Sequence, residues 1–355
     1  MDWNFIIFSL IKIFCVIGAV LAIFAYAVLA ERRISAFIQD RVGPNRVGLW
    51  GLLQPVADGV KSLLKEDFTP AHVRKVYFWL APAIVLIPSL LTVAVIPFGS
   101  KLGNQQMVIA NLNVGVLYTF GIVSLGVYGI VLAGYAANSK YPFLGGIRSS
   151  AQMISYEIAM GMSVVPLFMM VGDLNLNQVI AHQTGTLSWL PTFLKEWLAF
   201  VPNWLVFKQP LAFGIFLIAA FAETNRLPFD LPESEQELVG GYNTEYSSMK
   251  FALFFMGEYA NVVASSAMMV TLFFGGWTLP FYGLDQPATT FCGGLLHIGI
   301  FLTKVLALMV LFIWVRWMLP RFRYDQLMDL GWRRFIPLAL ANILVTAVWL
   351  WWRMK

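Results

Sequence analysis

Long apolar runs are the feature of this sequence that most restricts its fold. An α-helix rises 1.5 Å per residue, so about 20 apolar residues are needed to cross the ~30 Å hydrocarbon layer of a membrane. Seven runs are long enough: 5–30, 77–98, 112–137, 151–171, 251–276, 293–315 and 335–352. Only 12% of the residues are charged, against roughly 25% in soluble domains. We therefore expect a single transmembrane domain over residues 1–355.

A further apolar run, residues 211–222, is too short to cross a membrane unaided. At 1.5 Å per residue it covers about 18 Å. It can span if it begins near Asn203, with Lys208 reaching toward the surface, or if it continues so that Glu223 to Arg226 lie at membrane depth. With this helix included, the sequence predicts an all-α polytopic membrane protein with about eight transmembrane helices.

The distribution of positive charge predicts the orientation of these helices. Loops on the cytoplasmic side of a membrane carry an excess of lysine and arginine. The loops after the first, third, fifth and seventh of the eight helices hold 17 of the 24 lysines and arginines, and the opposite side holds 5. We therefore expect the loops 31–76 and 223–250 in the cytoplasm. Both termini would be periplasmic, in the inner membrane of a bacterium rather than of a mitochondrion. The net charge of +5 follows from this asymmetry and indicates no nucleic-acid partner.

The chain lacks the ligand sets that redox cofactors require. Cys15 and Cys292 cannot supply the four thiolates of an iron–sulfur cluster. His72 and His182 are predicted in loops and His297 near a helix end, so no histidine pair is placed to hold a haem. Phosphate-binding glycine loops and nucleophile motifs are absent from the sequence as well. We expect no metal site, no cofactor bound by this chain and no self-contained catalytic centre.

The first cytoplasmic loop contains an amphipathic stretch. In GLWGLLQPVADGVKSLLKEDFTP, leucines and valines recur at helical spacings, with Asp58, Lys61 and Lys65 among the polar positions and Gly59 presenting no side chain. This pattern is typical of a helix that lies in the membrane interface. Such a helix either covers the ends of other helices or frames a doorway for a lipid-soluble molecule.

Ionisable residues at membrane depth are the next signal. Glu157, Glu258 and Lys304 lie inside predicted spans, where each charge costs about 2.5–3.5 kcal/mol. Two interpretations are open: a glutamate pairs with Lys304 to hold helices in register, or the acids form a proton path. We favour the path, because the acids outnumber the available cations.

The segment AETNRLPFDLPESEQELVGGYNTEYS has six carboxylates and one cation, Arg226. The carboxylates are Glu223, Asp230, Glu233, Glu235, Glu237 and Glu245. Asp230 and Glu233 fit a helix N-cap and its reciprocal partner. Asp230, Glu233 and Glu237 also fall on one helical stripe, where a pair about 6 Å apart repels by roughly 3 kcal/mol, or about two pKa units. Such a cluster would exchange protons near neutral pH.

Three long motifs resemble a membrane subunit family of respiratory complex I, the proton-translocating NADH:quinone oxidoreductase. They are GLLQPVADGVKSLLKE (51–66), GYAANSKYPFLGGIRSSAQMISYEI (134–158) and the acidic segment, in the family's order. Ser234 stands where the bacterial and mitochondrial members of this family usually have alanine or glycine. The resemblance implies a subunit without a redox group, at the junction of the hydrophilic and membrane arms. Its partners would be the quinone-reducing subunits of the hydrophilic arm, adjacent membrane subunits, lipid and quinone, with ubiquinone the expected substrate.

The resemblance also implies roles for individual residues. A quinone tunnel would run among the first helix, the amphipathic helix, the helix at 251–276 and the acidic loop. The residues lining or flanking it would be Glu31, Arg32, Asp58, Gly59 and Phe229. The path that couples quinone chemistry to proton pumping would consist of Glu157, Glu223, Asp230, Glu233, Glu235, Glu237 and Glu258.

Three alternatives stay open at this point. A related subunit of membrane-bound hydrogenases would share the fold but not the quinone site. A secondary transporter normally has two similar halves with broken helices, and the sequence has no such repeat. A purely structural anchor would tolerate neutralisation of every acid in the loop.

Overall fold

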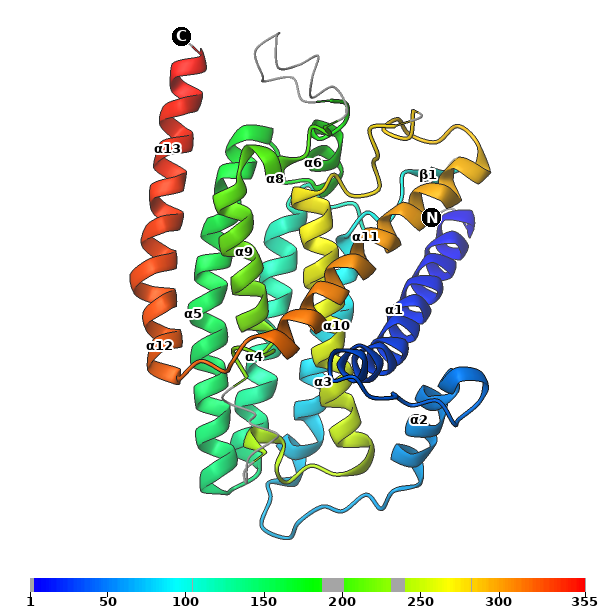
Figure 1. Ribbon diagram of the computed structural model, residues 1–355, viewed down its shortest axis with the longest axis vertical. Coiled ribbons are helices and arrows are strands. Elements are labelled where there is room, and N and C mark those ends of the chain that lie inside the picture. Colours follow the sequence, from blue (N-terminus) through cyan, green and yellow to red (C-terminus); the bar gives the residue numbers. More distant parts are fainter. Residues whose placement is uncertain (1–2, 104, 187–200, 231–239, 282, 355) are drawn as a thin grey trace.

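The computed structural model describes residues 3–103, 105–186, 201–230, 240–281 and 283–354, and in them the chain is almost entirely helical (Figure 1). The helices are α1 (Trp3–Ile38), the 3₁₀ turn η1 (Leu49–Gly51), α2 (Gln54–Leu64), α3 (Lys75–Thr92), η2 (Val93–Val95), α4 (Gly115–Ala136), α5 (Lys140–Val171), α6 (Leu176–His182), α8 (Leu205–Lys208), α9 (Pro210–Glu223), η3 (Gly241–Asn243), α10 (Ser248–Phe273), α11 (Phe291–Met318), α12 (Tyr324–Asp329), the π-helical η4 (Leu330–Phe335) and α13 (Ile336–Met354). Strands β1 (Lys101–Leu102) and β2 (Gln105–Gln106) pair antiparallel.

Seven helical segments of the described chain are long and apolar enough to cross a membrane. They are α1, α3 with η2, α4, α5, α10, α11 and the continuous α12–η4–α13. The predicted all-α polytopic fold is confirmed. Three segments extend well beyond their apolar runs: α1 continues to Ile38, α5 begins at Lys140, and the last span begins at Tyr324. Residues 31–38, predicted as the start of a loop, are therefore the last turns of α1.

The eighth apolar helix is built from two pieces. Leu205–Lys208 forms α8, Gln209 breaks the helical conformation (φ −133°, ψ 60°), and Pro210 starts α9, as proline favours the first position of a helix. The apolar run is thus extended upstream by α8, with a break at Gln209. α9 packs against α5 and α10 with fully buried alanines at 212, 219, 220 and 222, and small residues allow close helix approach in membranes.

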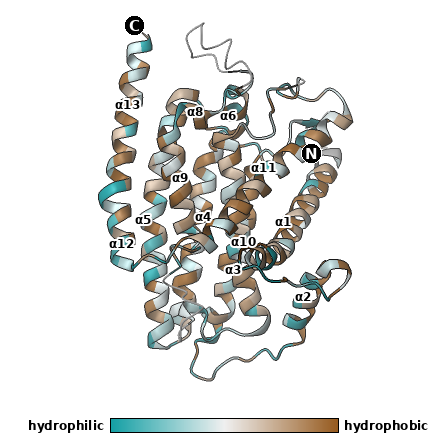
Figure 2. Ribbon diagram, in the orientation of Figure 1, coloured by the Kyte–Doolittle hydropathy of each residue, from teal (hydrophilic) through white to brown (hydrophobic). Residues whose placement is uncertain are grey.

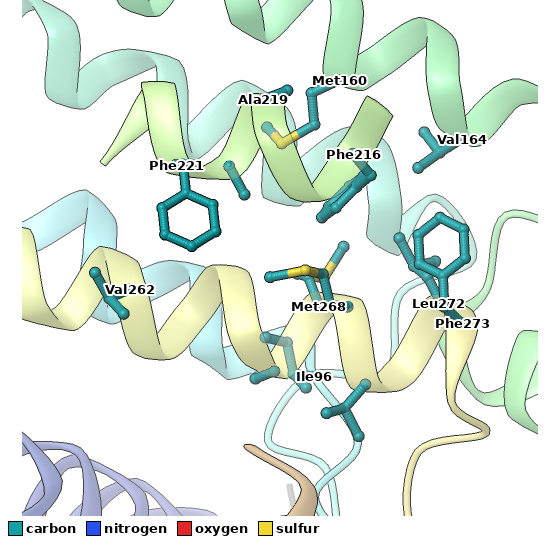
Figure 3. Close-up of a cluster of buried hydrophobic side chains, with 14 of the residues drawn as sticks. Ile96, Met160, Val164, Phe216, Ala219, Phe221, Val262, Met268, Leu272 and Phe273 are labelled. Carbon is teal, nitrogen blue, oxygen red and sulfur yellow. The ribbon is translucent and has the colours of Figure 1, made fainter. Parts of the chain in front are cut away.

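The core lies between α5, α9 and α10. Figure 3 shows its side chains, which include Met160, Val164, Phe216, Phe221, Met268 and Phe273. α3 packs closely on both α4 and α10, because Gly129 of α4 and Gly257 of α10 present no side chain: a Cβ there would lie 2.6 and 2.7 Å from Val85 of α3. α10 is the most buried of the spans and α1 the least buried. α1 and α11 lie on one flank of this core and α13 on the other (Figure 1).

Both termini lie at one end of the bundle, and α2 lies toward the other (Figure 1). Hydrophobic residues follow the long helices, and hydrophilic residues are frequent around α12 and at the start of α5 (Figure 2). The predicted amphipathic helix is α2, of which no residue is buried. Its apolar side chains Val56, Val60, Leu63 and Leu64 are all exposed. That exposure suits a helix at the membrane interface; which end faces the cytoplasm stays a prediction.

Candidate functional site

The turn after α9 carries Arg226 into a buried position between α1 and α10. Asn225 precedes it in a left-handed conformation (φ 48°), which asparagine tolerates better than most residues. The Arg226 N–H donates to the carbonyl of Phe221 at 3.2 Å and closes the end of α9. Gln152 of α5 donates to the carbonyl of Ala222 at 2.8 Å. The turn is therefore fixed from both sides.

Arg226 shares its guanidinium between carboxylates from two helices. Its Nη1 lies 3.7 Å from Oε2 of Glu31 in α1, and its Nη2 lies 3.8 Å from Oε2 of Glu258 in α10. Its Cζ also lies 4.1 Å from the ring centre of Tyr259, a cation–π contact. All three charged residues are less than one-tenth exposed, at 8%, 8% and 9%. Charges so deeply buried need partners of this kind.

A second arginine, Arg316 near the end of α11, reaches the same Glu31. Its Nη1 donates to Oε1 of Glu31, and the hydroxyl of Tyr259 donates to Oε2. The hydroxyl of Tyr242 donates to Oε1 of Glu258 at 3.2 Å. Glu31 consequently connects α1, α10 and α11.

Asp230 extends the charged group toward the connection between α11 and α12. Its Oδ2 lies 3.4 Å from Nη2 of Arg321. A cavity of about 10 Å³ borders Asp230, Arg226, Glu258 and Arg316, near the lower size limit for one water molecule. We call Glu31, Arg226, Asp230, Glu258, Arg316 and Arg321 the arginine–carboxylate cluster.

The cluster contains cations that the acidic segment itself does not hold. Arg226 is the only cation in the acidic segment, and the acids were expected to outnumber nearby cations. Folding instead brings Arg321, 91 positions away from Asp230, beside that carboxylate, and brings Arg316 beside Glu31. The charge balance of the segment alone is therefore a poor guide to the charge balance of the site.

Two tyrosines of the site were not predicted from the sequence. Tyr259 directly follows Glu258 in α10, and Tyr242 lies in η3. In the sequence, Arg316 and Arg321 indicated only the orientation of the helices. A signal was present in each case: a tyrosine next to an intramembrane acid, and arginines at the end of an apolar helix.

Glu223 is the last residue of α9 and is 4% exposed. Its Oε2 has no hydrogen-bond partner among the described residues. It borders a cavity of about 20 Å³ that Asn261 and Ser265 of α10 also line, large enough for one water molecule. Asn261 lies one helical turn from Glu258, on the same face of α10. Glu223 thus lies between the arginine–carboxylate cluster and α5.

Glu157 of α5 continues this row of acids outward. Its charge acts on Glu223. It also lines a groove of about 1020 Å³ between α4 and α5, whose other lining residues are mostly apolar. Glu157 therefore stands between a buried carboxylate and an open face of the protein.

Lys304 does not pair with a glutamate in the described part of the chain. Its Nζ donates to the carbonyls of Phe274, Gly276 and Thr278 at 2.8, 2.9 and 2.7 Å. These carbonyls follow α10, where a positive charge suits the helix dipole. The interpretation of Lys304 as a partner of an intramembrane glutamate was wrong.

The tunnel residues predicted on α1 and α2 lie together. Nη1 of Arg32 lies 2.8 Å from Oδ2 of Asp58, and Gln54 donates to Oδ1 of Asp58 at 3.0 Å. Ser248, at the start of α10, donates to the carbonyl of Ser62 at 2.9 Å. α2 is thus fastened to α1 and α10, while a Cβ placed at Gly59 would meet no atom within 4 Å.

Phe229 lies apart from that pair. It is 3% exposed, stacks on Phe322 with ring centres 5.5 Å apart, and contacts Tyr156 at 5.6 Å. Within this chain it therefore packs the acidic turn onto α5 and onto the connection after α11.

The remaining predicted positions divide into two groups. Glu233, Glu235 and Glu237 lie outside the described residues, so their arrangement stays a prediction. Glu245 lies 3.8 Å from Nε2 of His72.

The predicted position of one histidine was wrong. His182, predicted in a loop, is the last residue of α6. Within the described ranges, no group of three or more histidine, cysteine, aspartate or glutamate side chains is placed to hold a metal ion.

Comparisons with known proteins extend over almost the whole chain. The NADH dehydrogenase family model matches residues 11–347. The H 1 subunit of the NADH-quinone oxidoreductase of Cytophaga hutchinsonii is 48% identical over 333 residues, 92% of each chain. The H subunit of the NADH-quinone oxidoreductase of Syntrophotalea carbinolica is 48% identical over 352 residues, 98% of each chain. NADH-quinone oxidoreductase subunit 8 of Rhodothermus marinus is 47% identical, with 94% of this chain and 95% of that protein covered. The resemblance inferred from the three motifs is confirmed, and the chain belongs to the NADH dehydrogenase family.

Proposed function

We propose that this chain is the membrane subunit through which an NADH:quinone oxidoreductase couples quinone reduction to proton translocation. The names of its relatives support this assignment over a hydrogenase subunit or a transporter. The observation that carries the proposal is the arginine–carboxylate cluster, in which buried charges from α1, α10 and α11 meet the turn after α9. We expect the chain itself to bind no cofactor. Its partners are the other subunits of the complex, which supply the electrons.

Quinone, with ubiquinone the expected form, enters between α1, α2 and α10. The apolar side chains of α2 are exposed, which suits passage of a long prenyl tail from the lipid. Arg32 and Asp58 join α1 to α2 beside this entrance, and Gly59 leaves open space on the helix. Glu31 is one residue from Arg32, so a molecule at the entrance lies near the arginine–carboxylate cluster.

The cluster links a change of charge at the quinone to the acids farther inside. Reduction of a quinone to a quinol consumes two protons and transiently adds negative charge. Glu31 and Glu258 share Arg226. A new negative charge that draws Arg226 away from one of these carboxylates therefore also changes its attraction to the other. Ion pairs respond strongly when they are buried, because a separated partner is left uncompensated at a cost of about 3–5 kcal/mol.

Glu223 and Glu157 then carry the response to the surface of the subunit. Glu223 borders a cavity large enough for one water molecule. That water would join its carboxyl group to Asn261 and so to the face of α10 that carries Glu258. Glu157 opens onto the groove between α4 and α5, where we place a neighbouring membrane subunit. Protons held on these carboxylates couple the two ends of the row.

The proposed setting is the bacterial inner membrane. The asymmetry of lysine and arginine supports a cytoplasmic position for α2 and the acidic loop and a periplasmic position for both termini. This orientation lets the quinone entrance meet the hydrophilic arm.

The experiment is a Glu223→Gln substitution in the assembled complex, reconstituted into sealed vesicles. Gln keeps the size of the side chain and removes the titrating group, so assembly should survive. Inhibitor-sensitive NADH:quinone reductase activity and proton pumping should fall together, by at least tenfold, because a blocked proton step also stalls electron transfer in a coupled machine. Asp285→Asn, in the loop between α10 and α11, is the matched control and should leave both rates unchanged. Wild-type rates in Glu223→Gln would refute the role of this acid.

A further inference from the structure

A second polar cavity lies at the end of the bundle that holds the termini. It measures about 580 Å³, within the roughly 300–1,000 Å³ typical of small-molecule sites. The ends of α5 and α6, the start of α9 and the last turns of α13 line it. Its polar lining residues are His182, Asn203, Lys208, Gln209, Asn342, Thr346 and Arg353. The functional site proposed above uses none of them.

The floor of this cavity is held rigidly by Gln209, at the break between α8 and α9. Its Nε2 donates to Oγ1 of Thr346 at 3.0 Å, and Asn342 donates to its Oε1 at 3.1 Å. Both partners are on α13. The helix break therefore places Lys208 opposite the last turns of α13 in a fixed geometry.

The charge of the cavity is positive. Lys208 and Arg353 both line it, and the charge of Arg353 acts on Lys208. Among the residues that the structure describes, the lining contains no aspartate or glutamate, and neither cation forms an ion pair there. Burial and the neighbouring Lys208 lower the pKa of His182, so at neutral pH the two longer side chains supply the charge. Two like charges held together in this way favour an anionic ligand.

The position of the cavity indicates where that anion comes from. Trp349 lines it, with its ring 5.4 Å from Cζ of Arg353, and Trp351 and Trp352 lie in the same helical turns. Tryptophans of this kind mark the membrane–water interface, which is the depth of lipid headgroups. Below the cations the cavity wall is apolar, formed by Leu211 and Val345, which are 43% and 67% exposed. Positive charge next to an exposed apolar wall is complementary to a phosphate group that is attached to acyl chains.

We propose that this cavity binds the phosphate group of an anionic phospholipid, between Lys208 and Arg353, with the acyl chains along α9 and α13. Basic pockets between transmembrane helices bind lipid headgroups on the cytoplasmic side of membranes, and the same charge attraction applies at this end of the bundle. The bound lipid would fill the gap between α13 and the core at the end opposite α2. Its place in the complex does not depend on the quinone site.

The test uses the purified complex and phospholipids that carry a photoactivatable group in the headgroup. Labelled phosphatidylglycerol should crosslink to peptides containing residues 203–211 and 342–353, and labelled phosphatidylcholine much less. Lys208→Gln and Arg353→Gln should each weaken labelling about fivefold, the fold-change that corresponds to about 1 kcal/mol per cation. Lys208→Arg should restore it. Arg334→Gln, which removes a positive charge just before the opposite end of α13, is the matched control and should have no effect at these peptides.

Three results would overturn the proposal. Equal labelling by phosphatidylcholine would remove the charge selectivity. Unchanged labelling in both Gln variants would exclude the two cations. Full competition by inorganic phosphate at matched phosphate concentration would make the cavity a site for the free ion. Arg353 is exposed, so Arg353→Gln keeps the test valid even if Lys208→Gln disturbs assembly.

Discussion

Arg226→Gln is the substitution that examines the arginine–carboxylate cluster most directly. At the observed 3.7 and 3.8 Å, and with an effective dielectric of about 20, each attraction is about 4–5 kcal/mol before desolvation. Part of that attraction offsets the desolvation of three charges that are almost fully buried. Removing one partner from such a group typically costs about 3–5 kcal/mol, because the remaining charges stay buried without compensation. We expect a loss of stability of that size in the subunit.

The two carboxylates should respond differently to this change. Glu31 keeps Arg316 and the hydroxyl of Tyr259, whereas Glu258 loses the arginine paired with it and keeps the hydroxyl of Tyr242. Neutralising Glu258 as well should therefore restore part of the lost stability. The double variant Arg226→Gln/Glu258→Gln should be more stable than Arg226→Gln alone.

The assay is the thermal midpoint of the purified complex, together with the fraction of complex that assembles. The two single variants and the double variant form a double-mutant cycle, which isolates the coupling between the residues. Arg226→Lys keeps the charge and serves as the control for loss of the planar guanidinium. A double variant whose loss equals the sum of the two single losses would refute the reasoning, because independent residues give additive effects.

The remaining predictions concern the entrance, the acids and the orientation. Gly59→Leu should raise the KM for a long-tailed quinone more than for a short-tailed analogue, while Gly121→Leu, also in open space, should change neither; equal effects at Gly59 would indicate general misfolding. Glu157→Gln should assemble and lose quinone reductase activity together with proton pumping, and a variant that pumps at the wild-type rate would exclude Glu157 from the path. A reporter fused to the C-terminus should be active only in the periplasm, and cytoplasmic activity would reverse the orientation.

Much of the architecture could be predicted from the sequence because membrane spans are encoded locally. A run of about 20 apolar residues identifies a span without knowledge of its neighbours, and the same holds for the exposed apolar face of α2. The helix ends were less predictable. Polar residues such as Glu31 and Arg32 ended the apolar run, yet both have good helix propensity. α1 therefore continues past the hydrophobic stretch to Ile38.

The composition of the site could not be predicted in the same way, because it depends on contacts between distant segments. Glu31 and Arg316 are 285 positions apart, and no local pattern relates them. The resemblance to a known family identified Glu31 and Glu258, but the partners that neutralise them emerge only when α1, α10 and α11 meet. Glu223 is a different case. The sequence already showed an acid at the end of an apolar run, and the structure adds the small cavity beside it.

The position of the cluster indicates which parts of the subunit can respond to its charge. α10 is held in the core, whereas α1 and α11 lie on its flank and bury far less of their length. Near its C-terminal end, α1 is joined to α10 and α11 by Glu31. The energy of van der Waals contacts along weakly buried helices changes little when a charge appears nearby, whereas the energy of a buried ion pair changes strongly. A charge arising near Glu31 should therefore shift α1 and α11 against α10, and α2 would follow, because Arg32 and Asp58 tie it to α1. The quinone entrance and the acid row would then change shape in one step.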